Sequence, residues 1–438
     1  MDTVLRDHYL AEHARLAGQL PGDGWLQSER KTALQRFADA GFPTPREESW
    51  KYTDLRMLEK LRPGASAPVD LDATTIQQHL PARLDGYRLV FVNGHYAPTL
   101  SDIGALPHGA TLGPLAAHLD KPGEILHSQL NTSVNGSRTA LTDLNTAFMT
   151  DGLYLQLADG VALDRPVHLL FIADDAGMIN LRNLIRLGRN SEAVVIEHYV
   201  GADDAQTLTN VVTEAQAAPG SRFTRCKLQQ ESFTAWHLGG FYLDQSSDSH
   251  AHLHGVDLGG RLVRNDTHSR LAGTGAEVRL QGVYAPSGRQ HIDNHTRIDH
   301  LQPQGTSRET YKGVLDGHGR GVFNGKIVVH KGAQKTDSEQ SSAALLLSKT
   351  AEVDAKPELE IHADDVKCAH AATVGQLDED AVFYLQSRGV DQAGARNILT
   401  YSFADEVIRQ VGIEALRKHI EAHFMAKLPN GQMLRELL

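Results

Sequence analysis

The stretch "YKGVLDGHGRGVFNGKIVVHKG", residues 311–332, decides the fold class. It holds two short segments in which apolar and polar residues alternate, and Gly, Asp or Asn bounds each of them. Such alternation places the apolar side chains on one face, as in a half-buried β-strand, and the bounding residues form turns. Similar segments recur from about residue 150 to residue 390, where helical periodicity is almost absent. We therefore expect a mainly β protein.

Short strands in this number can form a sandwich, a barrel or a solenoid of stacked coils. We favour the solenoid, because the apolar positions come in brief clusters separated by irregular polar bends. The triplet Gly282-Val283-Tyr284 also recurs loosely as Gly313-Val314-Leu315. The expected fold is a β-helix flanked by helical regions at both ends of the chain.

Helical periodicity marks the two ends. An apolar face over residues 30–40 stops at Gly41, and residues 391–438 carry two apolar stripes separated by Gly412. Leu399, Phe403 and Val407 form the first of these stripes at positions i, i+4 and i+8. The stripes either pack on the solenoid and on each other or dock a partner. We predict an N-terminal helical and mixed domain over 1–149, a β-helix core over 150–390 and a C-terminal helical domain over 391–438.

Charge and hydropathy argue against several classes of protein. The net charge is −11, with 54 acidic and 43 basic residues interspersed, so no basic tract is present to bind nucleic acid. No apolar run approaches the roughly 18 residues of a membrane span. The first residues, "MDTVLRDHYL", lack the basic start and apolar run of a secretion signal. We expect a cytoplasmic protein that contacts neither membrane nor nucleic acid.

Glycine-rich segments do not predict a nucleotide site. Gly325-Lys326 has Arg320 where a phosphate-binding loop needs glycine and Ile327 where it needs Ser or Thr. The segment "AGTGAEV" (272–278) has Val278 where the dinucleotide fingerprint needs a small residue. Both segments are typical of turns between strands, so we expect no nucleotide to bind this chain.

Histidine is abundant, with 23 residues, and His250, His252 and His254 alternate in "SHAHLHG". On a strand these imidazoles share one face at a spacing of about 7 Å, which would allow a shared metal. A polar strand face is the commoner cause of such alternation, and no carboxylate in the run orients the rings. Metal binding there stays open. So does an autonomous β-helix hydrolase acting on a carbohydrate or ester, with Asp and His from neighbouring coils.

Cys226 and Cys368 are the two cysteines of the chain. Cys226 shares a strand face with Thr224 and Leu228, which favours a core position. In "DDVKCAHAAT" (364–373) an extended chain would place Cys368 and His370 side by side on one face. Sulfur and imidazole donors suit iron, zinc or copper, but two ligands leave half of a coordination sphere empty, which a second protein would have to complete. The alternative is a buried structural cysteine beside an exposed histidine.

Residues 311–390, including "KCAH" at 367–370, resemble the signature region of the SufB/SufD family of iron–sulfur cluster assembly proteins. The resemblance extends to "PTPREESWKYTDL" (43–55), to residues 144–171 and to "NILTYSFADEVI" (397–408), and so covers most of the chain. The chain length and the presence of only two cysteines favour the D branch of the family over the longer, cysteine-richer B branch.

The resemblance implies a right-handed parallel β-helix and the role of a scaffold without catalytic residues. SufB would be the partner in a heterodimer formed through the β-helices, with a homodimer possible for the isolated chain. The SufC ATPase would dock on the C-terminal helices, at Leu399, Phe403 and Val407, and would hydrolyse the ATP. Iron or a transient Fe–S cluster would be shared with SufB, with His370 as the main ligand from this side and Cys368 assisting it. The family also implies a role in iron acquisition.

Overall fold

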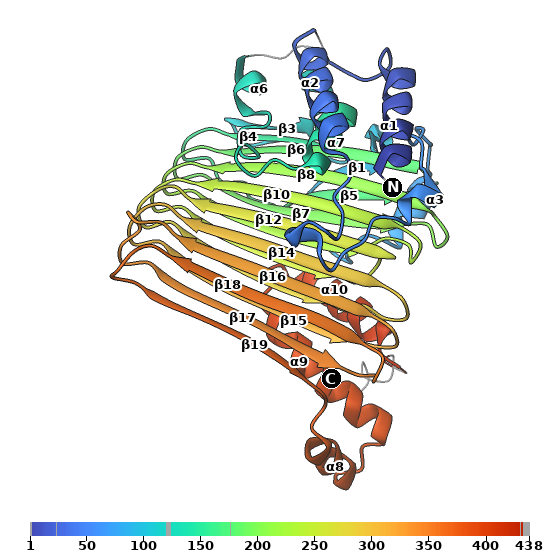
Figure 1. Cartoon of the computed structure of the whole chain (residues 1–438), viewed down its shortest axis with the longest axis vertical. Helices are drawn as coiled ribbons and strands as arrows, with labels where there is room; N and C mark the ends of the chain where they lie inside the picture. Colours follow the sequence, from blue (N-terminus) through green and yellow to red (C-terminus); the bar gives the residue numbers. More distant parts are fainter. Residues whose placement is uncertain (1, 23, 120–123, 176, 430, 432–438) are drawn as a thin grey trace.

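The computed structural model of the chain describes residues 2–22, 24–119, 124–175, 177–429 and 431 (Figure 1). Two long sheets run the length of the molecule. One has the strand order β19-β17-β15-β13-β11-β9-β7-β5-β1-β2 and the other β18-β16-β14-β12-β10-β8-β6-β4-β3. Strands that follow each other in the chain alternate between the sheets, so each pair forms one coil of a parallel β-solenoid. The prediction of a mainly β solenoid between helical ends is confirmed.

The strands of the solenoid are mostly eight to eleven residues long. Their bounds are β4 Leu153–Leu157, β5 Val167–Ala173, β6 Gly177–Leu187, β7 Glu192–Gly201, β8 Thr207–Ala217, β9 Arg222–Gln230, β10 Trp236–Gln245, β11 His250–Asp257, β12 Leu262–Leu271, β13 Glu277–Tyr284, β14 His291–His300, β15 Thr306–Leu315, β16 Arg320–Val329, β17 Asp337–Leu346, β18 Glu352–Ile361 and β19 Lys367–Gly375. Short strands β1 Tyr87–Val92, β2 His95–Tyr96 and β3 Ala110–Pro114 precede them.

Alternate side chains of every strand point between the two sheets and form the continuous apolar core. Glycines make room there for tyrosine rings. Gly282 pairs with Tyr311 and Tyr284 pairs with Gly313 on the neighbouring strand. A Cβ on Gly282 would lie 2.2 Å from Tyr311 Cε1, and one on Gly313 would lie 2.5 Å from Tyr284 Cζ. The two loosely repeated triplets therefore lie on adjacent coils, but they are offset by two positions.

Helices from the N-terminal region cover the outer side of the β6/β8 sheet at the first coils (Figure 1). Helix α7 packs against β6 and β8, and α2 packs against α7. The helices of this region are α1 Asp2–Leu16, α2 Gly24–Ala40, η1 Glu48–Trp50, α3 Leu58–Leu61, α4 Ala73–Gln77, η2 Pro98–Leu100, α5 Ala116–Leu119, α6 Glu124–Gln129 and α7 Ala140–Phe148.

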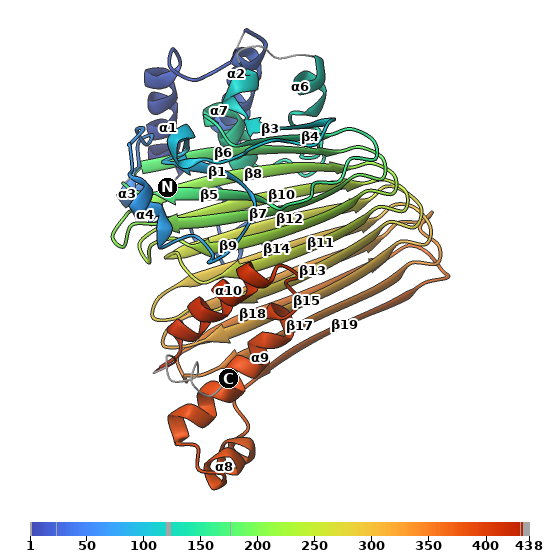
Figure 2. The same cartoon turned by 180° about the vertical axis from the view of Figure 1, so that it is seen from behind.

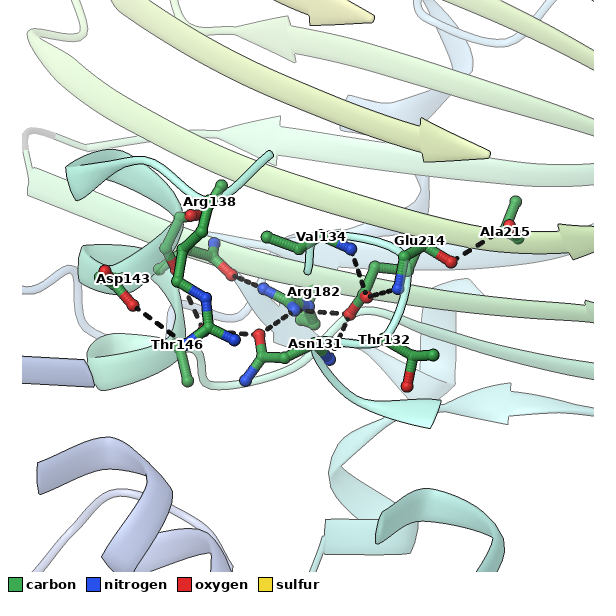
Figure 3. Close-up of polar contacts among 12 residues, drawn as sticks. Asn131, Thr132, Val134, Arg138, Asp143, Thr146, Arg182, Glu214 and Ala215 are labelled. Atoms are coloured by element: carbon green, nitrogen blue, oxygen red, sulfur yellow. Dashed lines mark hydrogen bonds and ion pairs between the residues drawn. The ribbon is translucent and has the colours of Figure 1, made fainter. Parts of the chain in front are cut away.

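A buried ion pair fastens this region to the solenoid (Figure 3). Arg182 on β6 donates to Glu214 on β8 at 2.5 Å, and the two side chains are 0% and 3% exposed. Glu214 also accepts the backbone N–H groups of Asn131, Ser133 and Val134 at 2.8, 2.9 and 3.2 Å. One carboxylate thus satisfies three backbone donors of the segment that leads into α7.

The C-terminal helices cover the outer side of the other sheet (Figure 2). They are α9 Gln392–Ile408 and α10 Glu414–Lys427, and the shorter helix α8 Glu379–Ser387 precedes them. Val407, Ile420 and Phe424 bury their side chains against outward-facing apolar residues of β7 to β15. Cys226 belongs to the same buried cluster, which confirms its predicted core position. None of the helices in the described ranges is long and apolar enough to cross a membrane.

Strand β19 ends at Gly375, and helix α8 then extends beyond the last coil (Figures 1 and 2). The residues of α8 belong to the sequence range 150–390 that we expected to form the β-helix. Asp378 caps α8 by accepting the backbone N–H of Asp380.

Candidate functional site

Among the residues that the structure describes, no further strand covers the last two strands of the solenoid. Within the described residues β19 pairs with β17 alone and β18 with β16 alone. Alternate residues of β17 are buried, whereas every β19 residue except Cys368 is exposed. Val374 is 52% exposed and Ile361 is 43% exposed. The last coil therefore presents free backbone N–H and C=O groups together with an apolar surface, which is the arrangement to which another strand adds.

Cys368 and His370 lie together on β19. Their pairing partners Ser338 and Gln340 are buried, so both residues follow positions whose side chains point between the sheets. The thiol of Cys368 is half-buried and packs against the core, while His370 is exposed. The spacing in the sequence thus does bring thiol and imidazole to one face of a strand. Burial, and then the carboxylate of Asp337, raise the pKa of Cys368, so the free thiol keeps its proton at neutral pH.

Polar side chains occupy the core beneath these two residues. Gln340 Nε2 donates to Glu309 Oε2 at 2.6 Å, and both residues are at most 2% exposed. Burial raises the pKa of Glu309 to about 7, although the hydrogen bond from Gln340 lowers it. Beside them Ser307 and Ser338 share a hydrogen bond of 2.7 Å. On the two preceding strands of this sheet the corresponding positions are Leu280 and Leu253, whereas the strand before them has the buried Arg225, which is paired with Glu197.

These interior polar residues were not predicted from the sequence. The signal was present in "TSRET" (306–310) and "DSEQSS" (337–342), where strand alternation places Ser, Glu and Gln at positions that should be apolar. A second missed signal is Pro357 in the middle of β18. Proline has no backbone donor for a ladder and is typical of edge strands.

The described residues hold no group of three or more His, Cys, Asp or Glu side chains arranged to bind a metal ion. Cys368 and His370 together offer one sulfur and one nitrogen donor. The histidines of β11 lie on its outer face, where His250 Nδ1 is 3.3 Å from Glu277 Oε2. His254 is buried, and burial lowers its pKa to about 4.

The three residues predicted to dock a partner on α9 are not freely exposed. Leu399 and Phe403 are half-buried, and the Nζ of Lys312 lies 4.4 Å from the centre of the Phe403 ring. Val407 is 3% exposed and faces the solenoid. The large exposed apolar side chains of this region are instead Phe383 (70%) and Tyr384 (56%) on α8. Docking of a partner at Leu399, Phe403 and Val407 stays a prediction. In that case Val407 would not touch the partner but would pack beneath the two half-buried residues.

Comparison with known proteins defines the class. Residues 170–403 match the model of the SUF system FeS cluster assembly SufBD core domain, and residues 6–169 match that of the SufBD protein N-terminal region. The chain belongs to the SufBD family of iron–sulfur cluster assembly proteins.

Its relatives include SufD proteins. The chain is 33% identical to the iron–sulfur cluster assembly protein SufD of Escherichia coli over 91% of its own length and 92% of the relative. It is 31% identical to a SufBD family protein of Synechocystis, over 93% and 92% of the two chains. The SufD protein of Bacillus subtilis is 26% identical, over 90% and 92%. The chain is thus of the SufD type, and this relationship supports a role in iron–sulfur cluster assembly.

Proposed function

We propose that this chain is a non-catalytic scaffold subunit of cytoplasmic iron–sulfur cluster assembly, which pairs with SufB through the open end of its solenoid. The observation that carries the proposal is the uncovered last coil, where β18 and β19 each lack a second neighbour among the described strands and β19 exposes its side chains. A partner strand on this edge would satisfy the free backbone groups and cover Val374.

The nascent cluster is the cargo of this interface. His370 would provide the main iron ligand from this chain and Cys368 would assist it, since iron accepts nitrogen and sulfur donors. Two donors do not fill the coordination sphere of iron, so the partner supplies the others. The site then exists only in the assembled pair, and the chain takes part in iron acquisition through His370.

The C-terminal helices would couple this interface to the SufC ATPase. Helices α9 and α10 pack on strands β7 to β15 of the sheet that ends in β19. A displacement of these helices would reach β19 through the intervening strand β17. ATP would be bound and hydrolysed by SufC.

The test is anaerobic purification of the chain co-expressed with SufB and SufC, followed by measurement of iron and acid-labile sulfide. We expect His370→Ala to lose most of the iron and Cys368→Ala to lose part of it. His362→Ala is the matched control, because His362 is also exposed and lies on the same coil, directly after β18. Normal iron content in the His370→Ala complex would refute the assignment. The mass of the chain in solution with and without SufB separates the heterodimer from a homodimer.

A further inference from the structure

Residues paired from strand to strand form a column of inward-facing side chains that ends at His370. The polarity of this column changes along the solenoid. Through the strand pairings the buried Arg225 of β9 is followed by Leu253 of β11 and Leu280 of β13, and then by Glu309, Gln340 and finally His370. An ordinary core would continue with leucine. Here the last three positions are polar, and they lead to the open end of the solenoid.

Gln340 sits in this column with half of its hydrogen-bonding capacity unused. Its amide is 1% exposed, and Nε2 is engaged by Glu309 Oε2 at 2.6 Å. Its Oε1 has no hydrogen-bond partner among the described residues. A buried carbonyl oxygen without a partner is destabilising, so such an atom calls for an explanation. Gly325 on the opposite sheet makes room for the amide, because a Cβ there would lie 2.3 Å from Gln340 Nε2.

We propose that Gln340, oriented by Glu309, is a positioning residue for His370. His370 is the next residue in the column, about 4.8 Å away between the backbones of paired strands. Its exposed imidazole has no hydrogen bond within the described residues, so a change of rotamer can bring it toward Gln340. One ring N–H of His370 then donates to Gln340 Oε1.

This contact has a defined consequence for the ligand. A histidine that donates from one ring nitrogen has a fixed tautomer, and its other nitrogen is free to bind metal. Glu309 fixes the orientation of the Gln340 amide. Its Oε2 accepts a hydrogen bond from the NH₂ of Gln340, which leaves the carbonyl oxygen of Gln340 to accept from His370. The inference rests on the proposed role of His370 as an iron ligand.

The test compares Gln340→Leu, which restores the apolar residue of the deeper coils, with the exchange Glu309→Gln/Gln340→Glu. The exchange keeps an amide donor facing a carboxylate and keeps an oxygen at position 340. Ser338→Ala is the matched control, because it removes a buried polar group from the same strand beneath Cys368. The chain is labelled with ¹⁵N-histidine, and the His370 signals are assigned by their loss in His370→Ala.

We expect the His370 nitrogens to show one tautomer in the wild type, the exchange variant and Ser338→Ala, but a mixture in Gln340→Leu. In the complex with SufB and SufC, Gln340→Leu weakens iron binding about tenfold or more. Unchanged His370 signals and iron binding in folded Gln340→Leu would overturn this inference while leaving the proposed function intact. Retention of iron by His370→Ala would instead overturn the proposed function. Circular dichroism confirms that each variant is folded.

Discussion

Replacing Arg182 by methionine tests how the N-terminal region is held on the solenoid. The guanidinium is 0% exposed and donates to Glu214 at 2.5 Å, to Asn131 Oδ1 at 2.6 Å and to Asn145 Oδ1 at 3.1 Å. Removing one partner of a buried ion pair costs about 3–5 kcal/mol, because the other charge stays buried. Glu214 keeps its three backbone N–H donors, so we expect a loss near 3 kcal/mol in the free energy of unfolding.

Urea unfolding followed by circular dichroism measures this loss. Arg189→Met is the matched control, because Arg189 pairs with Asp159 at 2.9 Å with both side chains more than half exposed. An exposed pair contributes at most about 1 kcal/mol. The double variant Arg182→Met/Glu214→Met removes both buried charges and should recover part of the loss. Equal effects of Arg182→Met and Arg189→Met would refute the reasoning.

Two further predictions concern the pH dependence of stability and the packing of helix α10 on the solenoid. Burial lowers the pKa of His168 to about 3. Below pH 6.5 the unfolded chain therefore binds a proton there that the folded chain does not, so the free energy of unfolding decreases as the pH is lowered. Between pH 7 and pH 5 the His168→Gln variant should lose about 2 kcal/mol less stability than the wild type. Thermal melts that show the same pH dependence for both proteins would contradict this. Phe424→Ala should destabilise the chain by about 3–5 kcal/mol in urea, since Phe424 is fully buried between α10 and the sheet. Phe383→Ala, at a 70% exposed residue, should change stability by less than about 0.5 kcal/mol, and similar losses for both would contradict the packing of α10.

Local patterns in the sequence predicted the type of structure in most of the chain but not every element. The segment "YRLVFVNG" (87–94) has the apolar run of a strand followed by Asn-Gly; it forms β1, and the turn after it uses Asn93 and Gly94 with φ of 49° and 83°. The apolar stripe that stops at Gly41 is helix α2. Helix α8 was not predicted, although Asp378 is a good N-cap, because its short apolar run resembles the strands before it.

The site was less accessible from the sequence. The spacing of Cys368 and His370 predicted a shared strand face, because the period of a strand is local. Their different exposure depends on the coil that would come next, and alternation cannot show which coil is the last. The same limit hid Gln340, since its significance lies in the residue stacked above it and not in its sequence neighbours.

The position of Cys368 and His370 on the last coil also bears on how firmly they are held. In a solenoid each coil is stabilised by its contacts with the coils on either side, so stability resembles a sum of nearest-neighbour terms. The β18–β19 coil has one such neighbour among the described residues, and its backbone amides should therefore exchange with solvent sooner than those of the inner coils. A chain that adds strands to this end supplies the second neighbour. Association with that chain and suppression of fraying in β19 would then be a single event.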